Sequence, residues 1–429
     1  MTDGTPIDGE KLYAKVAWRI IPFAFLLYII AFIDRTNVSI AKLKFQGDLG
    51  LSNEMYGIGA GLFFIGYFLF EVPSNLILQR VGARIWIARI MISWGIVSSC
   101  FMFMDGKASF YFLRFMLGVT EAGFFPGLIL YLSYWFPVRR RARVVGAFMT
   151  AIPMSWVIGA PLSGEIMDRM HNVMGMTGWR WMFLLEGLPA IVLGVSVLWL
   201  FTDRPQKATW LTPAERDWID ADLAIDQAII AEGGRKDFKG AFTDYRIWWL
   251  VALYLTNVMA NYGLPLWMPQ VIKDSDPTLS DRMVGWLCII PWAVTATVMM
   301  ANGWHSDRQN ERRWHIAIPH FIAAIGILGA GMSLNNTPQL IFFLCVTLAG
   351  VNSALGVFWA LPAAFITGAA AAGGIAVINS VGNLGGYVGP DTIGKLKDTY
   401  GFNGGFLAIA ASLCIGAILV LLFPVKKSP

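Results

Sequence analysis

Two short clusters of charged residues interrupt apolar segments in the first third of the chain. Asp34 and Arg35 are adjacent, and Arg114 precedes Glu121 by two helical turns. A charged side chain at the centre of a bilayer costs roughly 2.5–3.5 kcal/mol on insertion scales, so it persists mainly where it is paired and used. An arginine fork binds carboxylates, and a desolvated carboxyl group can take up a proton. These four residues therefore predict proton-coupled binding of an anion.

A second interpretation of the same four residues stays open. They could form a permanent ion-pair brace between two helices, a role that suits Asp34 best. In the functional interpretation, an anion competes with Asp34 or Glu121 for an arginine, and the released carboxylate becomes free to take up a proton.

The segments that must position these residues are long and apolar. Hydrophobic residues make up 56% of the 429 residues and charged residues 14%, and the mean hydropathy is +0.57. About 20 apolar residues cross a bilayer as a helix, because lipid cannot satisfy open backbone groups. We expect an all-α membrane protein with twelve transmembrane helices. The expected spans are 17–41, 55–77, 85–104, 108–131, 143–167, 180–201, 246–272, 283–304, 314–333, 339–361, 373–394 and 403–424.

A polar stretch divides the expected spans into two sets of six. We predict a six-helix bundle over 1–201, a cytoplasmic linker over 202–244 and a second bundle over 245–429. Thr212 and Pro213 predict a short helix inside the linker, with Thr as its cap. Most Lys and Arg residues fall in loops on one side if both termini are cytoplasmic, as the positive-inside rule requires. We therefore expect a multi-pass protein of the cell (inner) membrane.

Charge, cysteine spacing and the absence of catalytic motifs argue against several other functional classes of protein. The net charge of +5 is distributed as the positive-inside rule predicts, so no nucleic-acid partner is expected. The four cysteines are scattered singly and predict neither a metal site nor a disulfide framework. No metalloprotease motif, nucleophile elbow or phosphate-binding loop is present, so we expect no catalytic residues, no metal and no cofactor.

Depth along the helices brings the two charged clusters together. At about 1.5 Å of rise per residue, Asp34 lies about 22 Å beyond Arg19 at the inner edge. Arg114 lies about 10 Å in from Lys107 at the outer edge of a core about 30 Å thick. Asp34, Arg35 and Arg114 should therefore share one level if their helices are neighbours. Together with Glu121 they would then form a ladder in which the charges pair.

Several longer motifs carry a resemblance to a known family. They read FIDRTNV from Phe32, GYFLFEVPSN from Gly66, RFMLGVTEAGFFP from Arg114, GWRWMF from Gly178 and NSVGNLGG from Asn379. Basic loops at 79–84 and 306–313 occupy equivalent places in the two halves. On these motifs the chain resembles the major facilitator superfamily, and within it the anion:cation symporter family, in its tartrate, 4-hydroxyphenylacetate and phthalate permease branch.

The resemblance implies the major facilitator fold and roles for particular residues. The positions matching Asp34 and Glu121 couple protons, and those matching Arg35 and Arg114 serve anion binding or ion pairing. Substrate contact is expected from Tyr67 and Asn379, to which spacing and residue type add Asn383 and Trp359. The gating loops would use Arg80, Arg84, Asp307 and Arg308. Gln79 stands where the superfamily usually carries Asp, so the gate is expected to rely on Asp307.

The remaining carboxylates of the expected spans are given other roles. Glu71 shares a helix face with Tyr67 and is expected to pair helices. Glu165, Asp168 and Glu186 are expected to act in gates or in packing. His315 and His320 are expected to be interfacial histidines.

Together these observations predict a proton-coupled symporter that imports an organic carboxylate by alternating access, driven by the proton gradient. The substrate is an aromatic acid such as phthalate or 4-hydroxyphenylacetate, or a hydroxy acid such as tartrate. Three alternatives remain: an uncoupled facilitator or exporter of the same fold, a non-transporting membrane sensor, and an intramembrane enzyme, which the lack of recurring catalytic carboxylates or metal ligands disfavours.

Overall fold

The computed structural model describes residues 7–137, 140, 144, 148–232, 244–363 and 369–423. All regular structure in these ranges is helical. The helices are α1 (Gly9–Asp48), α2 (Asn53–Val81), α3 (Ala83–Cys100), α4 (Lys107–Glu121), α5 (Phe124–Ser133), α7 (Ala151–Arg169), α8 (Gly178–Leu200), α9 (Pro213–Glu232), α11 (Tyr245–Ser275), α12 (Asp281–Leu287), α13 (Ile289–Gln309), α14 (Trp314–Met332), α15 (Thr337–Phe358), α16 (Ala360–Ala363), α17 (Ala369–Gly382) and α18 (Gly385–Leu422).

Each of the twelve expected spans coincides with helix. Nine segments of the described chain are long and apolar enough to cross a membrane. The last of them, Gly374–Leu422, covers two expected spans and changes direction at Gly401. Helices α7 and α11 occupy the expected spans 143–167 and 246–272, although residues 143 and 145–147 lie outside the described residues. The all-helical fold with twelve membrane helices is therefore confirmed.

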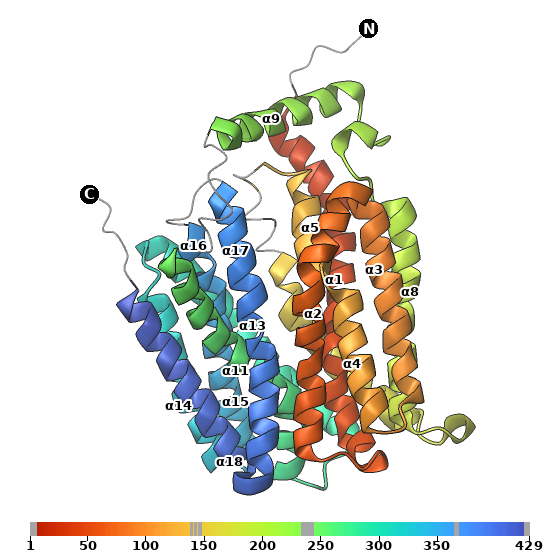
Figure 1. Cartoon of the computed structure of the whole chain (residues 1–429), viewed down its shortest axis with the longest axis vertical. Helices are drawn as coiled ribbons and strands as arrows, with labels where there is room; N and C mark the ends of the chain where they lie inside the picture. Colours follow the sequence, from red (N-terminus) through yellow and green to blue (C-terminus); the bar gives the residue numbers. More distant parts are fainter. Residues whose placement is uncertain are drawn as a thin grey trace.

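The helices lie in two groups, α1–α8 and α11–α18, side by side in Figure 1. We call the first group the N-terminal half and the second the C-terminal half. Helix α1 begins near the top of Figure 1, and α18 runs from the bottom upward and ends at the left. Both of these ends point toward the same side of the molecule, here named the terminal side. The boundaries 1–201, 202–244 and 245–429 stay a prediction.

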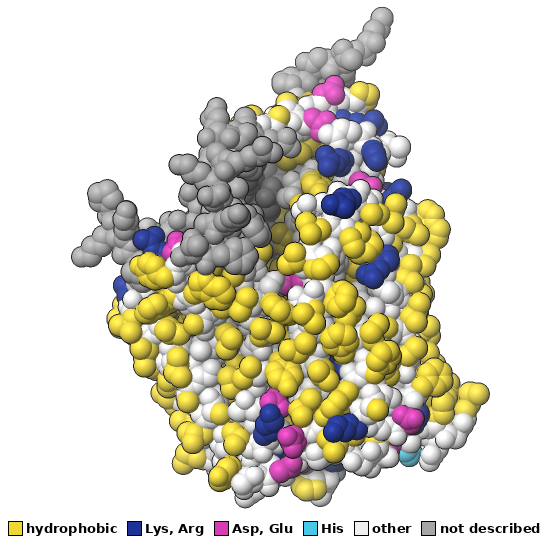
Figure 2. All heavy atoms as spheres, viewed as in Figure 1, with side chains coloured by type: hydrophobic (Ala, Val, Ile, Leu, Met, Phe, Trp, Pro, Cys, Tyr) yellow, Lys and Arg dark blue, Asp and Glu magenta, His cyan; other side chains and the backbone are white. Residues whose placement is uncertain are grey.

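The surface shown in Figure 2 agrees with burial in a bilayer. Hydrophobic side chains cover most of the middle of this face, whereas charged side chains gather toward its upper right and lower ends. Large apolar residues such as Trp199, Ile325 and Leu407 are more than 60% exposed. In water this exposure would be unfavourable, but lipid tails are as apolar as these side chains.

Helix α9 begins as the linker sequence predicts and lies at the top of Figure 1. The Thr212 hydroxyl accepts from the Glu215 backbone N–H at 3.2 Å, and the Glu215 carboxylate accepts from the Thr212 N–H at 2.8 Å. This reciprocal pair is a capping box. The Lys15 ammonium of α1 lies 2.8 Å from Glu215, which docks α9 on α1. Residues 233–243 of the expected linker lie outside the described part of the chain.

Two glycines set the geometry of α4 near its end. A Cβ atom on Gly118 would lie 1.9 Å from the backbone oxygen of Phe63, so only glycine lets α2 and α4 approach this closely. Gly123 has φ of 85°, a left-handed conformation that favours glycine, and it separates α4 from α5. Glu121 is thus the last residue of α4, and it is held where the helix breaks.

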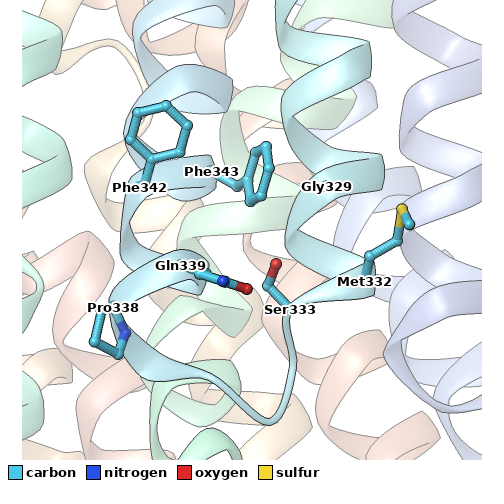
Figure 3. Close-up of a pocket in the computed structure, with 7 residues that line it drawn as sticks. All are labelled: Gly329, Met332, Ser333, Pro338, Gln339, Phe342 and Phe343. Atoms are coloured by element: carbon cyan, nitrogen blue, oxygen red, sulfur yellow. The ribbon is translucent and has the colours of Figure 1, made fainter.

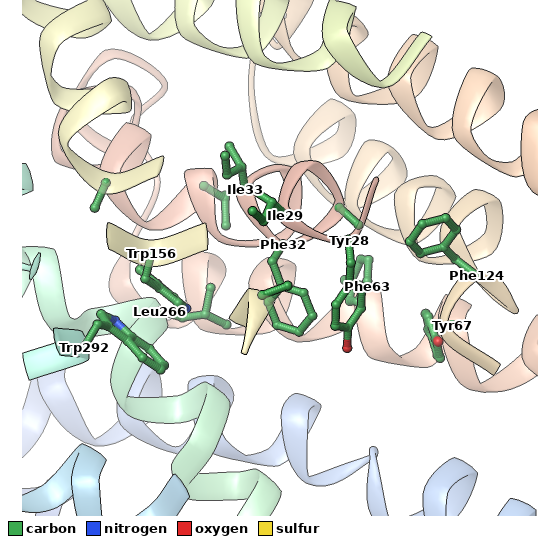
Figure 4. Packing of buried hydrophobic residues seen from close by; sticks show 14 of the residues in the cluster. Tyr28, Ile29, Phe32, Ile33, Phe63, Tyr67, Phe124, Trp156, Leu266 and Trp292 are labelled. Atoms are coloured by element: carbon green, nitrogen blue, oxygen red, sulfur yellow. The ribbon is translucent and has the colours of Figure 1, made fainter. Parts of the chain in front are cut away.

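The two halves pack closely on the side opposite the chain ends, here named the opposite side. The Tyr56 hydroxyl of α2 donates to the Leu266 backbone oxygen of α11 at 2.8 Å. A Cβ atom on Gly57 would lie 2.7 Å from the Pro390 oxygen of α18. Arg282 of α12 pairs with Glu165 of α7 at 2.5 Å. Deeper in the molecule, Trp156 of α7 stacks on Trp292 of α13, with ring centroids 5.0 Å apart (Figure 4). The described state is therefore closed on the opposite side.

Candidate functional site

A buried ion pair joins α1 to α4. Nε of Arg35 donates to Oε1 of Glu121 at 3.1 Å, and Nη2 of Arg35 contacts the same oxygen. Arg35 is 8% exposed and Glu121 is 0% exposed. Removing one partner of such a pair costs about 3–5 kcal/mol, because the other charge stays buried and uncompensated. Arg35 can therefore leave Glu121 only if another anion takes its place or if Glu121 gains a proton.

The same guanidinium group also contacts the C-terminal half. Nη1 of Arg35 donates to the Tyr262 hydroxyl of α11 at 3.0 Å. The rings of Phe32, Phe63 and Tyr67 surround the guanidinium, with centroids 4.7, 5.1 and 5.6 Å from its carbon. Figure 4 shows these three rings among the buried aromatic side chains. Arg35 is thus placed to respond to changes in both halves.

Asp34 does not join the expected ladder of paired charges. Its two oxygens accept hydrogen bonds from Nε1 of Trp94 and Oγ of Ser98 on α3, each at 2.8 Å. Consecutive residues of an α-helix point about 100° apart, so Asp34 faces α3 while Arg35 faces α4 and α11. The expectation that the brace is strongest at Asp34 is wrong, because Glu121 is the carboxylate that binds Arg35.

Arg114 makes weaker contacts than Arg35. Its Nη2 donates to the Ala60 backbone oxygen at 2.8 Å and its Nε to the Gly59 oxygen at 3.4 Å. The side chain is 1% exposed, and Nη1 has no hydrogen-bond partner among the described residues. Oε2 of Glu121 likewise has no partner there. A buried guanidinium with an unused donor favours an additional anionic partner.

The two arginines are close neighbours, as depth along the helices predicts. The guanidinium carbons of Arg35 and Arg114 lie 5.1 and 5.2 Å from the centroid of the same Phe63 ring. The expected cationic level therefore exists, with one aromatic ring shared by both cations.

A second polar contact crosses between the halves. Asn379 of α17 donates from Nδ2 to Oε1 of Glu71 at 2.7 Å, and the Ser380 hydroxyl donates to Oε2 at 2.8 Å. Glu71 thus pairs helices, as expected. The Asn379 amide, predicted to contact substrate, is occupied by Glu71 in this state. Tyr67 lies one turn from Glu71 and is 5% exposed.

The remaining predicted contact residues of the C-terminal half lie near this region. Trp359 packs edge-on against Tyr254 of α11, with centroids 5.0 Å apart. Asn383 follows Asn379 by one turn, at the break between α17 and α18. Asn257, on α11, bonds to His320 and to the Val351 backbone oxygen. His320 is 1% exposed, so its expected interfacial position is wrong; His315 bonds to Glu311 at the start of α14.

The expected gating residues bond mainly within their own half. The Arg84 backbone N–H donates to Asp203 at 2.9 Å, which places a carboxylate from the end of α8 beside the loop that carries Gln79. Asp307 pairs with Arg312 at 2.5 Å, and Arg308 lies over the Trp304 ring. Arg80 is exposed near the end of α2. Their role in gating stays a prediction.

Sequence reasoning missed Tyr262 and Lys42. Tyr262 was one aromatic residue among many in an expected span, and only the packing of α11 on α1 shows its contact with Arg35. Lys42 was placed just beyond the expected span 17–41, but it is 1% exposed. Its ammonium lies 3.3 Å from the Trp267 ring centroid and 4.4 Å from that of Tyr56, with no hydrogen-bond partner in the described chain. The sequence signal that could have found it is that Lys42 directly follows the expected span 17–41 and continues the same helix.

A pocket of about 630 Å³ lies elsewhere, between the end of α14 and the start of α15 (Figure 3). Its lining residues are Gly329, Met332, Ser333, Pro338, Gln339, Phe342 and Phe343. The lining contains no charged side chain and none of the residues discussed above, so this pocket is not the candidate site.

Comparisons with known sequences indicate one family. The sequence profile of the Major Facilitator Superfamily matches residues 24–390. A "Putative tartrate transporter" of Agrobacterium vitis is 49% identical over 98% of this chain and 92% of its own. The "Putative metabolite transport protein NicT" of Pseudomonas putida is 42% identical over 97% of this chain and 95% of its own.

Solved structures agree on the fold. A bacterial homologue of the human lysosomal transporter Spinster, in an inward-facing and unoccupied conformation, superposes with a TM-score of 0.78. It covers 97% of this chain and 98% of that chain, at 16% identity. The xylose transporter XylE from E. coli, in a partially occluded inward open conformation, gives a TM-score of 0.77 over 95% of this chain and 99% of that chain, at 14% identity. At such identities the likeness concerns the fold alone.

Proposed function

Since this chain belongs to the major facilitator superfamily, and its relatives fit the anion:cation symporter branch, we propose that it is a proton-coupled symporter for an organic carboxylate. The family and these relatives are transporters and not enzymes, so the chain is a multi-pass membrane protein that moves a small molecule. The proposal adds the chemical class of the substrate, the coupling to protons and the direction of transport.

The observation that carries the proposal is the buried pair of Arg35 and Glu121. A substrate carboxylate that binds Arg35 competes with Glu121 for the guanidinium fork. Once it has lost its cation, Glu121 lies in a water-poor site, where the neutral, protonated form is favoured. Binding of one anion is thereby linked to uptake of a proton. Nη1 of Arg114, which has no hydrogen-bond partner among the described residues, offers a second donor to the same substrate.

Alternating access supplies the transport step. The described state is closed on the opposite side, and Arg35 contacts both halves through Glu121 and Tyr262. In this proposal the terminal side faces the cytoplasm of the cell (inner) membrane, and the described state releases substrate there. The proton gradient supplies the free energy, so no cofactor is required.

Two substrate classes follow from different observations. Two relatives that are 48–49% identical are named putative tartrate transporters, which favours tartrate, a hydroxy acid with two carboxylates that suits two neighbouring arginines. The rings of Phe32, Phe63 and Tyr67 around Arg35 favour an aromatic acid, such as phthalate or 4-hydroxyphenylacetate, as the second candidate.

Uptake into proteoliposomes tests the proposal. We expect an inward-directed proton gradient, with the outside solution more acidic, to drive accumulation of labelled tartrate or of one of the two aromatic acids. A protonophore and the Glu121→Gln substitution should each abolish accumulation. Accumulation that reaches only equilibrium, with or without the gradient, would identify a facilitator and contradict the coupling.

A further inference from the structure

Lys42 of α1 is a buried cation that the proposed function does not use. Its ammonium lies 3.3 Å from the Trp267 ring centroid and 4.4 Å from that of Tyr56. This ammonium has no hydrogen-bond partner in the part of the chain that the structure describes. Lys42 follows Arg35 by seven residues, or two turns, so the two cations lie on the same face of α1, about 10 Å apart along its axis.

The same three helices surround both cations. For the arginine, α2 supplies the ring of Phe63 and α11 supplies the hydroxyl of Tyr262. For the lysine, α2 supplies the ring of Tyr56, which precedes Phe63, and α11 supplies the ring of Trp267, which follows Tyr262. Helices α1 and α11 run toward the opposite side and α2 runs away from it. The lysine and its two rings therefore lie between that side and the arginine.

The two cations differ in their counterions. Arg35 is bound to a glutamate, whereas Lys42 makes no ion pair within the described residues. On α18, Lys397 shares the Trp267 ring, with its ammonium 5.5 Å from the centroid, but it pairs with Asp274 at 3.1 Å. Two cations, one from each half, thus lie by one ring, and one of them has a carboxylate partner. Unused donors on a buried ammonium favour an anionic partner.

Opening of the opposite side would uncover Lys42. Tyr56 belongs to the same half as Lys42, whereas Trp267 belongs to the C-terminal half. Separation of the halves at this side removes the Trp267 ring and leaves an ammonium group whose N–H donors can bind an anion. A carboxylate that enters from the opposite side meets Lys42 before it reaches Arg35.

We propose that Lys42 is an outer binding site for organic carboxylates, occupied while the opposite side is open, from which the substrate moves on to Arg35. This inference rests on the proposed function, because that function supplies the anionic substrate. An ammonium is a compact point charge without the planar fork of arginine, so it binds a carboxylate with less geometric specificity. Binding at Lys42 displaces no glutamate, and it therefore takes up no proton. The Trp267 ring covers the ammonium again when the opposite side closes.

Acylation of the Lys42 amine measures occupancy of this outer site. The full chain carries Arg35→Gln and Glu121→Gln, which neutralise the deeper ion pair together and leave neither partner as an uncompensated charge. A water-soluble N-hydroxysuccinimide ester should modify Lys42 whenever the opposite side opens, and peptide mass spectrometry gives the rate. We expect tartrate to slow this modification at least about two-fold relative to sodium chloride of equal ionic strength, as suits an ion pair in water.

Lys42→Cys in the same background is the matched control. A maleimide that labels its thiol reports opening at the same position, where no cation is left to bind tartrate. Tartrate should leave this labelling rate unchanged. Equal slowing of the thiol and amine reactions would mean that tartrate only closes the opposite side. An amine that tartrate does not protect, or that is never acylated, would equally overturn the inference.

Uptake into proteoliposomes gives a second readout. Salt screens charges and weakens electrostatic capture, so the wild-type kcat/KM for tartrate should fall as the ionic strength rises. Lys42→Gln should have a lower kcat/KM at low salt and should lose most of this salt dependence. The same salt dependence in both proteins would contradict capture by Lys42. If wild-type uptake ignores the proton gradient, symport is wrong, while protection of the Lys42 amine still decides whether the outer site exists.

Discussion

Nη1 of Arg35 donates to the hydroxyl of Tyr262 at 3.0 Å, and this hydrogen bond connects α1 of the N-terminal half to α11 of the C-terminal half. The same guanidinium group binds Glu121 of α4. A ligand that competes for Arg35 therefore disturbs an ion pair within one half and a hydrogen bond between the halves. This gives substrate binding a direct means of changing how the halves pack.

Replacing Arg35 by lysine should weaken tartrate binding at least about ten-fold, or about 1.4 kcal/mol. Lysine keeps the charge but loses the planar fork and the stacking on three rings. Thermal-shift titration of the purified protein measures the effect, because a ligand of the folded state raises its apparent stability. Arg19→Lys, on an exposed position of the same helix, is the matched control. Equal binding by Arg35→Lys and the wild-type protein would show that the fork is not the docking point.

Asp34→Asn should separate proton coupling from substrate binding. Asp34 is bonded to Trp94 and Ser98 and not to an arginine, so its neutralisation should change the tartrate dissociation constant by less than about three-fold. Proton-driven uptake should fall at least ten-fold, because the residue can no longer exchange a proton. If binding is lost together with uptake, Asp34 belongs to the anion site instead.

Lys42→Met should raise the melting temperature of the purified protein. Lys42 is 1% exposed, and within the described residues its ammonium contacts the rings of Trp267 and Tyr56 without a hydrogen-bond partner. Replacing a buried charge by an apolar group of similar size is often neutral or stabilising. Transport should slow, because the opposite side would open less readily. Lys11→Met, on an exposed lysine, should change stability by less than about 0.5 kcal/mol. A lower melting temperature for Lys42→Met would mean that the cation–ring contacts outweigh the cost of burial.

Docking of α9 on α1 should weaken in acid. Partial burial acts to raise the pKa of Glu215, but hydrogen bonds from Lys15 and Thr212 outweigh it and hold this pKa below the usual range. A lowered folded-state pKa stabilises the docked helix above the ordinary pKa of glutamate, and that contribution is lost as the pH falls through the folded-state value. Hydrogen exchange of α9, corrected for intrinsic rates, should therefore quicken as the pH falls below the ordinary pKa of glutamate.

Glu215→Gln is the control for this acid effect. Its exchange in α9 should already be fast at neutral pH and should change little on acidification. Equal pH dependence in the wild-type protein and in Glu215→Gln would show that Glu215 is not the group whose protonation releases α9.

The lengths of the apolar segments were enough to predict the twelve spans, and the rise per residue was enough to predict that Arg35 and Arg114 share one depth. That their two helices are neighbours was expected only from the family resemblance. The partner of each charge could not be predicted in the same way, because spacing does not fix how a helix is rotated toward its neighbours. Asp34 was therefore assigned to an arginine, although it faces α3.

Contacts between the halves were the hardest to foresee. Tyr262 with Arg35, Asn379 with Glu71, and Trp267 with Lys42 join residues more than 200 positions apart. Such contacts depend on which conformation of the two halves is populated, and a sequence encodes more than one conformation in a transporter of this family.

The exchange of Glu121 for a substrate carboxylate on Arg35 can be measured as proton uptake on ligand addition. Purified protein in weakly buffered solution is mixed with tartrate, or with whichever acid gives a thermal shift, and the pH is followed. We predict that the wild-type protein takes up protons as it binds the ligand, and that Glu121→Gln binds without taking up these protons. Saturable binding with no proton uptake by the wild-type protein, or full binding by Arg35→Ala, would contradict the exchange of Glu121 for a substrate carboxylate on Arg35.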